Sequence, residues 1–322
     1  MKNNSILIAC GEPNSIFLEI FFKTLIKNNF KKPIILIVSK TLLLKQMKQL
    51  GFNFQINLVD KNKINFHKIN NKKINLINID YKFDAAFNRI SNKSNKYITD
   101  CFSTALTLLK TNKFSGFING PISKKHFLKQ KFFGMTEYFS EKTNKKNHVA
   151  MLIYNKKLSV SPITTHLPIK DVHRSISKKK IINHVILINK FYRKKFKKVP
   201  KIAVTGLNPH CESNYASSEE ERIIKPAIKF LIKKKYKIKG PYPTDTIFLS
   251  ELSSKFDVII GMYHDQVLTP IKTLFGFDAI NITLGLPFIR ISPDHGPNEK
   301  MLGQNKSNPQ SLIQAIKFLD KK

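Results

Sequence analysis

The chain has 322 residues, of which 42% are hydrophobic, and its formal net charge is +35 at pH 7. Its length favours two domains or one large α/β unit over a small binding module, and its longest apolar runs are too short for a membrane helix. The charge invites a nucleic-acid-binding reading, but only five of the 56 basic residues are arginine, the residue best suited to phosphate and base-edge recognition. We therefore interpret the lysine runs as solvated surface and expect neither nucleic acid nor membrane as a partner.

The N-terminal part predicts alternating strands and helices. In order, we expect a strand over 6–10, a turn over 11–14, a helix over 16–26, a strand over 33–39 and a helix over 41–50 that ends at Gly51. The segment from about 53 to 80, rich in asparagine, lysine and isoleucine, has short alternations without clear turn chemistry. It receives no assignment.

The alternation continues along the chain. Helical spacing covers 94–111, a strand follows over 116–119 before the break at Gly120–Pro121, and an amphipathic helix covers 309–319. Strands that alternate with helices predict an α/β fold with a doubly wound, mostly parallel sheet. No G-x-G-x-x-G motif is present, so the ordinary dinucleotide-binding fingerprint is missing.

Three apolar, strand-like segments each lead to a histidine. They read LSVSPITTH ending at His166, KIAVTGLNPH ending at His210 and FDVIIGMYH ending at His264. The carboxyl ends of strands in an open α/β sheet line its ligand crevice, where neutral imidazoles could converge on one divalent metal ion. The pattern favours a metal-dependent enzyme. Five other histidines are interpreted as structural: His67, His126, His148, His173 and His184.

Polar residues follow the third histidine. The residues downstream of His264 include Lys272, Asn281 and Arg290. A phosphorylated, carboxylate-bearing substrate bound beside a metal would require such cationic and amide groups. The alternative is a surface lysine and an arginine paired with Asp294.

At this point the chain resembles the 4-hydroxythreonine-4-phosphate dehydrogenase family of pyridoxal 5'-phosphate biosynthesis, and the resemblance runs nearly end to end. The motifs that carry it are NGPISK (119–124), GMTE (134–137), THLPIKDV (165–172), GLNPH (206–210), EEERIIKPAI, GPYPTDTIF (240–248), MYHDQ (262–266), NITLGLPFIR and DHG. The resemblance implies an isocitrate/isopropylmalate dehydrogenase-like fold. Its expected subdomains are residues 1–128 with 283–322 on the cofactor side, and 129–282 on the metal and dimer side.

Carried over by position, the resemblance implies a set of site residues. The metal ligands are His166, His210 and His264, with the third supplied across a dimer interface. The substrate-binding residues are Thr136, Lys272, Asn281 and Arg290. Asp245, Asp265 and Lys272 are catalytic candidates, the two aspartates to orient ligands or handle a proton. His295 and Gly296 are the cofactor-binding candidates.

The implied reaction is oxidation of 4-phosphooxy-L-threonine by NAD+ or NADP+ in a cytoplasmic homodimer that holds Zn2+, Mg2+ or Co2+. The ion would favour ionisation of the substrate hydroxyl and assist hydride transfer to the nicotinamide. The product, 2-amino-3-oxo-4-phosphooxybutanoate, would lose CO2 to give 3-amino-2-oxopropyl phosphate. The scattered residues Cys10, Cys101 and Cys211 agree with a reducing compartment, because they form no disulfide framework.

The chain departs from the family pattern in several loops. Met135 stands where the family has histidine, and Ser15 and Phe17 stand where it has glycine. CESNYASSEEE replaces a glycine-rich segment after His210, while Pro297 and Lys300 replace threonine and aspartate. All three histidines are retained.

Two other functions stay open. The loss of the histidine at position 135 supports an oxidative decarboxylase of a related phosphorylated hydroxy acid, such as threonate or erythronate 4-phosphate. The charge leaves a basic nucleic-acid-binding protein without catalysis as a remote alternative.

Overall fold

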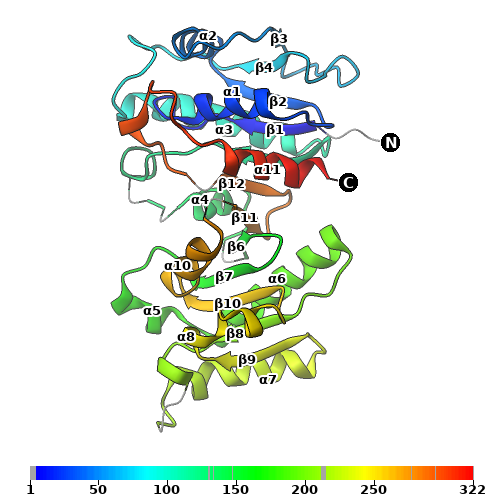
Figure 1. Cartoon of the computed structure of the whole chain (residues 1–322), viewed down its shortest axis with the longest axis vertical. Helices are drawn as coiled ribbons and strands as arrows, with labels where there is room; N and C mark the ends of the chain where they lie inside the picture. The colour runs from blue at the N-terminus through cyan, green and yellow to red at the C-terminus, as the bar shows by residue number, and fades with distance from the viewer. Residues whose placement is uncertain are drawn as a thin grey trace. The chain divides into compact units, whose positions relative to one another are not determined.

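The computed structural model of the chain describes residues 5–129, 131–132, 134–146, 148–211, 215–276, 278–293 and 295–321. The chain divides into two compact units (Figure 1). Unit 1 contains residues 1–132 and 288–322, and unit 2 contains residues 133–287. The expected boundaries lay at 128/129 and 282/283. The assignment of a cofactor side and a metal side remains a prediction.

Unit 1 has a parallel sheet. Its strands lie in the order β3 (Ile56–Leu58), β4 (Ile74–Asn78), β2 (Ile34–Val38), β1 (Ser5–Ala9), β5 (Phe114–Asn119) and β12 (Arg290–Pro293). Every neighbouring pair in this order is parallel. The loops after β1, β5 and β12 therefore leave the same edge of the sheet.

Helices cover both faces of this sheet. The helical segments of unit 1 are α1 (Phe17–Lys27), α2 (Lys40–Gln49), η1 (Asn92–Ser94), α3 (Asn95–Leu109), η2 (Lys124–Leu128), η5 (Glu299–Met301) and α11 (Gln310–Asp320). A Cβ at Gly116 would meet Leu319 of α11, whereas the neighbouring Phe117 ring packs against Phe102 of α3. Successive strand residues point to opposite faces, so α11 and α3 lie on opposite sides of β5.

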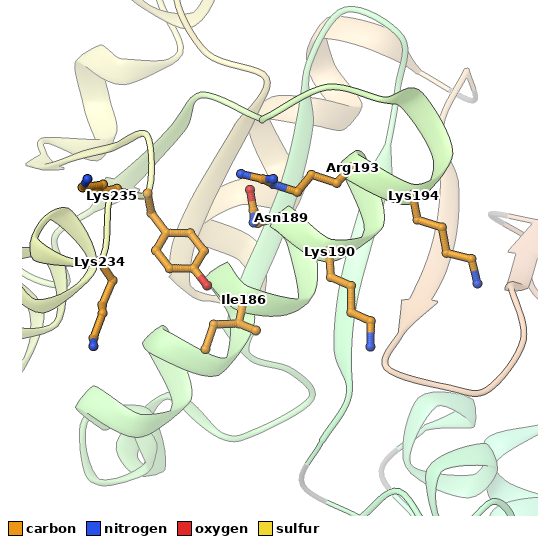
Figure 2. A pocket seen from close by; sticks show the side chains of 8 residues that line it. Ile186, Asn189, Lys190, Arg193, Lys194, Lys234 and Lys235 are labelled. Carbon is orange, nitrogen blue, oxygen red and sulfur yellow. The ribbon is translucent and has the colours of Figure 1, made fainter.

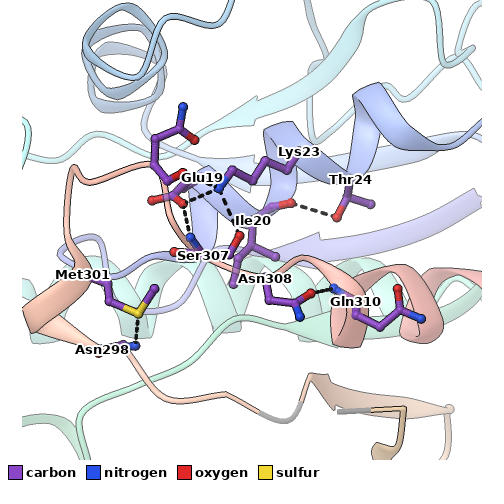
Figure 3. A network of polar contacts seen from close by, with 10 residues as sticks. Glu19, Ile20, Lys23, Thr24, Asn298, Met301, Ser307, Asn308 and Gln310 are labelled. Carbon is purple, nitrogen blue, oxygen red and sulfur yellow. Dashed lines mark hydrogen bonds and ion pairs between the residues drawn. The ribbon is translucent and has the colours of Figure 1, made fainter. Parts of the chain in front are cut away.

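A partly buried ion pair on α1 binds the segment that precedes α11 (Figure 3). Oε1 of Glu19 accepts from the backbone N–H of Ser307 at 2.6 Å and from the Lys23 ammonium at 2.8 Å. The same ammonium donates to the carbonyl oxygens of Asn305 and Ser307. These hydrogen bonds attach residues 305–307, which lead into α11, to α1. The C-terminal helix therefore packs in unit 1 with the N-terminal part of the chain.

The strands of unit 2 lie in the order β11 (Ile280–Leu284), β6 (Ala150–Tyr154), β7 (Ser159–Thr164), β10 (Val258–Tyr263), β8 (Ile202–Thr205) and β9 (Ile238–Tyr242). The last four are mutually parallel, whereas β6 runs antiparallel to β7 and to β11. The fold class is confirmed, because both units have mostly parallel sheets with helices between the strands.

Two helices of unit 2 sandwich β7. The helical segments are α4 (Met135–Lys142), α5 (Ile169–Ser175), α6 (Lys178–Phe196), η3 (Pro209–Cys211), η4 (Glu220–Ile224), α7 (Lys225–Lys233), α8 (Thr244–Ile247), α9 (Ser250–Ser253) and α10 (His264–Phe275). Val160 joins the apolar cluster that holds Val267 and Ile271 of α10. The hydroxyl of Tyr192 on α6 donates to Ser159 at 3.0 Å. α10 and α6 therefore cover opposite faces of the sheet at β7.

The elements predicted from the sequence are present. The strands and helices expected over 6–50, 94–119 and 309–319 correspond to β1, α1, β2, α2, α3, β5 and α11, with ends that move by at most two residues. The unassigned segment 53–80 contains β3 and β4. Among the described residues, no helix combines the length and apolar character that crossing a membrane requires.

Candidate active site

The three histidines follow three neighbouring parallel strands. β10 pairs with β7 on one side and with β8 on the other. His166 comes two residues after β7, His264 begins α10 directly after β10, and His210 lies in the turn after β8. Because the carboxyl ends of parallel strands share one edge, the sheet brings these three histidine-bearing turns to that edge.

His166 and His264 lie together. Their ring centroids are 5.7 Å apart, with 37° between the ring planes. Nδ1 of His264 is 2.6 Å from Oδ1 of Asp265. A neutral imidazole that donates Nδ1–H to a carboxylate presents its Nε2 lone pair on the other side of the ring, as in many metal sites.

His210 lies beside a second carboxylate. Its Nδ1 is 3.7 Å from Oδ2 of Asp245, in the short helix α8. Both pairs of side chains are largely exposed, so their contribution to folding stability is small. Instead, each pair places a carboxylate near Nδ1 of a candidate metal ligand, His264 in one pair and His210 in the other.

The backbone is strained at two of the histidines. His166 has φ +36° and His210 has φ +57°, in the left-handed region that L-residues seldom occupy. Such conformations persist where the surrounding structure enforces them, and they concentrate at functional sites.

The imidazoles and carboxylates of this region are of the type that binds a divalent metal ion, but a single chain does not bring three of them together. Imidazoles with carboxylate partners are ligands that Zn2+ and related ions accept. In the described part of the chain, however, no three histidine, cysteine, aspartate or glutamate side chains are grouped closely enough to hold one ion. The structure brings His166 to His264 and His210 to Asp245.

Glu220 fixes the turn that leads to His210. Oε1 of this buried side chain accepts from the backbone N–H groups of Leu207 and Asn208 at 2.7 and 2.9 Å, and Oε2 accepts from Nδ2 of Asn208 at 2.8 Å. Burial opposes ionisation of Glu220, but the hydrogen bonds from Asn208 and Leu207 outweigh it and lower the pKa of the carboxyl.

A small polar cluster contains two predicted substrate-binding residues. Oγ1 of Thr136 on α4 lies 3.4 Å from Oγ1 of Thr283 on β11. Asn281 is two residues from Thr283 and therefore points to the same face of β11. Oδ1 of Asn281 is buried, and no described residue hydrogen-bonds to it. The cluster thus holds a hydroxyl and a buried amide oxygen to which no described residue hydrogen-bonds.

The start of α4 contacts the histidine region. A Cβ built on Gly134 would lie 2.9 Å from Cε1 and 3.1 Å from Nδ1 of His166, and 3.1 Å from Oε2 of Glu137. Oε1 of Glu137 accepts from the hydroxyl of Thr165 at 3.3 Å. α4 therefore places Glu137 beside the His166 turn, on the same helix as Thr136.

Lys272 and Arg290, the predicted cationic groups, differ in environment. Lys272 is exposed on α10, two turns beyond His264. Arg290 of unit 1 is only 1% exposed, and its Nε donates to Oδ1 of Asn119 at 2.6 Å. Its Nη2 donates to Ser292. Asp294, the alternative partner of Arg290, lies outside the described residues.

The cofactor candidates belong to the loops at one edge of the unit 1 sheet. The His295 ring stacks on Phe17 with centroids 6.2 Å apart, and its Nδ1 lies 3.1 Å from the carbonyl oxygen of Gly296. The Pro297 carbonyl accepts from the N–H of Ile16. This pairing joins the loop after β12 to the loop after β1.

The residues that replace glycine in this region are accommodated inside unit 1. The hydroxyl of Ser15 donates to the carbonyl of Glu12 at 2.7 Å and accepts from the N–H of Phe17. Glu12 is itself fully buried, and its carboxylate accepts from Asn14 and Ser94. Burial raises the pKa of Glu12, although these hydrogen bonds oppose the shift.

A basic groove lies elsewhere on unit 2 (Figure 2). It has a volume of about 640 Å³ and is lined by Lys190, Arg193 and Lys194 of α6 and by Lys234, Lys235 and Tyr236 near the end of α7. None of the predicted site residues lines it. We assign it no part in the site.

Two supporting residues escaped the sequence reading. Glu137 lies in the GMTE motif and Glu220 in EEERIIKPAI, and the sequence pattern alone assigns neither of them a role. The available signal was an acidic residue next to a candidate ligand or substrate group, as in GMTE. Neither burial nor hydrogen bonding of these carboxylates can be inferred from spacing alone.

Comparisons with known proteins agree with the motifs. A sequence model of the family described as pyridoxal phosphate biosynthetic protein PdxA matches residues 29–319. A 4-hydroxythreonine-4-phosphate dehydrogenase of Sulfurihydrogenibium sp. is 39% identical over 317 residues, 97% of this chain and 96% of that protein. The enzyme of the same name from Aquifex aeolicus is 32% identical over 99% of this chain and 98% of its own length. The crystal structure of the Klebsiella pneumoniae enzyme of that name has a TM-score of 0.85 at 25% identity and covers 98% of each chain.

Proposed function

The chain belongs to the family of the pyridoxal phosphate biosynthetic protein PdxA, and from this premise we propose that it is a 4-hydroxythreonine-4-phosphate dehydrogenase. It oxidises the secondary alcohol of 4-phosphooxy-L-threonine with NAD+ or NADP+. The carbon-bound hydrogen leaves as hydride to the nicotinamide, the hydroxyl proton passes to a base, and the β-keto acid product then loses CO2.

His166, His210 and His264 would hold a divalent ion, Zn2+, Mg2+ or Co2+. When bound, the ion supplies Lewis-acid polarisation of the substrate oxygen. Asp265 keeps the imidazole of His264 oriented through Nδ1, whereas Asp245 lies 3.7 Å from Nδ1 of His210, beyond hydrogen-bond distance. Either carboxylate can also accept a proton from a donor beside it.

A second copy of the chain completes the ligand set in this proposal. The arrangement within one chain supports this idea. His166 lies close to His264, and among the described residues no three potential ligands lie together. We therefore propose a homodimer with the active site at the interface.

The substrate groups are matched by charge and hydrogen bonding. Thr136 and Asn281 provide a hydroxyl and a carboxamide on one face of β11. Lys272, exposed on α10, provides positive charge for the phosphate or the carboxylate, and Arg290, which is 1% exposed, stays a predicted substrate contact. Lys272 is also the third catalytic candidate, because an ammonium stabilises negative charge that develops on the substrate.

The nicotinamide cofactor is assigned to unit 1. The loops after β1, β5 and β12 leave one edge of a parallel sheet, where α/β proteins bind nucleotides. The N–H of Glu12 donates to Pro121 and that of Ile16 to Pro297, which ties these loops together. His295 and Gly296 lie in the third loop and remain predicted cofactor contacts, and cytoplasmic localisation remains a prediction.

The family match over almost the whole chain, with the three histidines retained, carries this proposal. The test is NAD(P)+ reduction, followed at 340 nm with 4-phosphooxy-L-threonine as substrate, in chelator-treated protein before and after addition of each ion. We expect turnover only after an ion is restored. Turnover that is unchanged in the stripped protein would remove the metal from the mechanism.

Met135 favours a second candidate substrate class. It begins α4 next to Thr136, where the family has a histidine that could donate to the substrate. Without that donor, threonate or erythronate 4-phosphate is the alternative substrate of the same oxidative chemistry. The ratio of kcat/KM for the two substrates decides between them.

A further inference from the structure

A single buried carboxamide joins the segments that carry the candidate metal ligands. Gln266 is in the first turn of α10 and is 7% exposed. Its Oε1 accepts from the backbone N–H of Met262 at 2.6 Å and from the hydroxyl of Thr205 at 3.0 Å. Its Nε2 donates to the carbonyl of Gly206 at 2.8 Å and to the hydroxyl oxygen of Thr244 at 2.9 Å.

These contacts use the whole hydrogen-bonding capacity of the amide. A carboxamide has two acceptor lone pairs and two N–H donors, and each is matched here. Its orientation is also fixed, because a flipped amide would point N–H at the Met262 N–H and oxygen at the Gly206 carbonyl. The hydrogen bonds therefore act together as one rigid link.

The three joined segments lead directly to site residues. Thr205 and Gly206 end β8 and begin the turn to His210. Met262 is on β10, two residues before His264. Thr244 is next to Asp245, which lies 3.7 Å from His210.

Two glycines allow the backbone to approach Gln266 and the adjoining turn closely. A Cβ at Gly261 would lie 3.0 Å from Oε1 of Gln266 and 2.4 Å from Val267. A Cβ at Gly206 would lie 2.5 Å from Sγ of Cys211 and 2.9 Å from Oε1 of Glu220. Glycine at these two positions lets the strand ends approach the amide and the turn that follows.

We propose that Gln266 is a positioning residue that sets the spacing between the His210 turn, Asp245 and His264, and through them the affinity and geometry of the metal site. The proposal rests on the proposed function, since it concerns the same metal. As a positioning residue, Gln266 touches neither metal nor substrate. It acts through the backbone of the turns that present the ligands.

The test compares Gln266→Met with wild type and with Tyr192→Phe. Methionine keeps the length and apolar bulk of the side chain and removes all of the amide contacts. Tyr192→Phe is the matched control, because it removes a buried hydrogen bond to Ser159 in the same unit, at the opposite end of β7. Thermal unfolding of all three proteins shows whether the two variants lose comparable stability.

The first readout needs no metal. Amide hydrogen exchange of the metal-free proteins, measured by mass spectrometry, should accelerate at least tenfold in segments 205–211, 242–247 and 261–266 of Gln266→Met. The Tyr192→Phe variant should leave these segments unchanged. Exchange in Gln266→Met that matches wild type in all three segments overturns the proposal.

The second readout is Co2+ binding, followed by the visible absorption of the bound ion. Loss of a residue that supports metal ligands typically weakens metal affinity by 10–100-fold, and we expect this loss together with an altered spectrum in Gln266→Met only. An equal loss in Tyr192→Phe, or a Kd within twofold of wild type in Gln266→Met, overturns the positioning role. Failure of the wild-type chain to bind Co2+ is a separate result, which removes the metal-dependent function itself.

Discussion

Nδ1 of His264 lies 2.6 Å from Oδ1 of Asp265, the next residue in the chain. The pair stands at the start of α10, where β10 delivers His264 to the edge of the unit 2 sheet. The carboxylate fixes which ring nitrogen carries the proton and so presents Nε2 to a metal ion. This short contact orients one proposed metal ligand directly.

Replacing Asp265 should weaken metal binding. In Asp265→Ala the His264 imidazole loses its partner, so its ring and tautomer are no longer held. We expect a 10–100-fold lower affinity for Zn2+ or Co2+ by isothermal titration calorimetry. Asp265→Asn, whose amide oxygen can still accept, should lose less. Asp100→Ala, which removes another exposed acid of an ion pair, is the control and should leave affinity unchanged. Equal affinities for all of these proteins would contradict the assigned role.

Adding a methyl group at Gly134 should displace His166. The new Cβ would lie 2.9 Å from Cε1 of His166, and because Gly134 has extended backbone the conflict is steric rather than conformational. We expect Gly134→Ala to cost about 1–3 kcal/mol of folding stability. Co2+ affinity should fall about tenfold, the lower end of the loss expected when a ligand is misplaced.

The matched control for Gly134→Ala is Lys142→Ala, on the exposed last turn of the same helix. Thermal unfolding and Co2+ titration are measured on both. If the two variants lose metal affinity to the same extent, contact with His166 is not the cause.

The sequence predicted most strands because they are short apolar runs bounded by glycine, proline or polar turns. β4 was missed for a physical reason. Asn75 is typical of turns, yet it is buried in this strand because its Nδ2 donates to the carbonyls of Ile34 and Asn70. Such a satisfied amide cannot be distinguished by pattern from a loop asparagine.

The histidines of the proposed site are visible in the sequence, whereas the residues that support their turns are not. Strand-end histidines are visible in the sequence, and the resemblance named the substrate groups. Gln266 reaches 61 residues along the chain to Thr205, and Glu220 reaches 13 residues back to the turn at Leu207. Whether such a polar residue is buried and fully hydrogen-bonded emerges only from the packed fold.

Folding stability should depend on pH through His184. This buried imidazole on α6 lies 3.0 Å from the carbonyl of Lys180 through Nδ1, and burial lowers its pKa to about 4 from its ordinary value of 6.5. The unfolded chain therefore binds a proton here at a higher pH than the folded chain does. The contribution of neutral His184 to the free energy of unfolding is on the order of 3 kcal/mol in total. It is fully present above pH 6.5 and is lost as the pH falls toward 4.

Urea unfolding at pH 7 and at pH 4.5 measures this effect. His184→Gln, which does not titrate, should be less stable than wild type at pH 7 but should lose about 2–3 kcal/mol less between the two pH values. His173→Gln, on the neighbouring helix α5, should follow wild type. Identical pH profiles for His184→Gln and wild type would assign the acid sensitivity to other groups.

Restoring the family histidine at position 135 should separate the two candidate substrates. Met135 begins α4 beside Thr136, so Met135→His places an N–H donor next to a predicted substrate-binding hydroxyl. A hydrogen bond to a charged phosphate or carboxylate is worth about 1.5–3 kcal/mol, hence we expect KM for 4-phosphooxy-L-threonine to fall about tenfold or more. Met135→Gln, which offers a neutral donor, should give a smaller decrease. If wild type instead prefers erythronate 4-phosphate and Met135→His reduces kcat/KM for it, the methionine selects that substrate and the assignment to 4-phosphooxy-L-threonine is wrong.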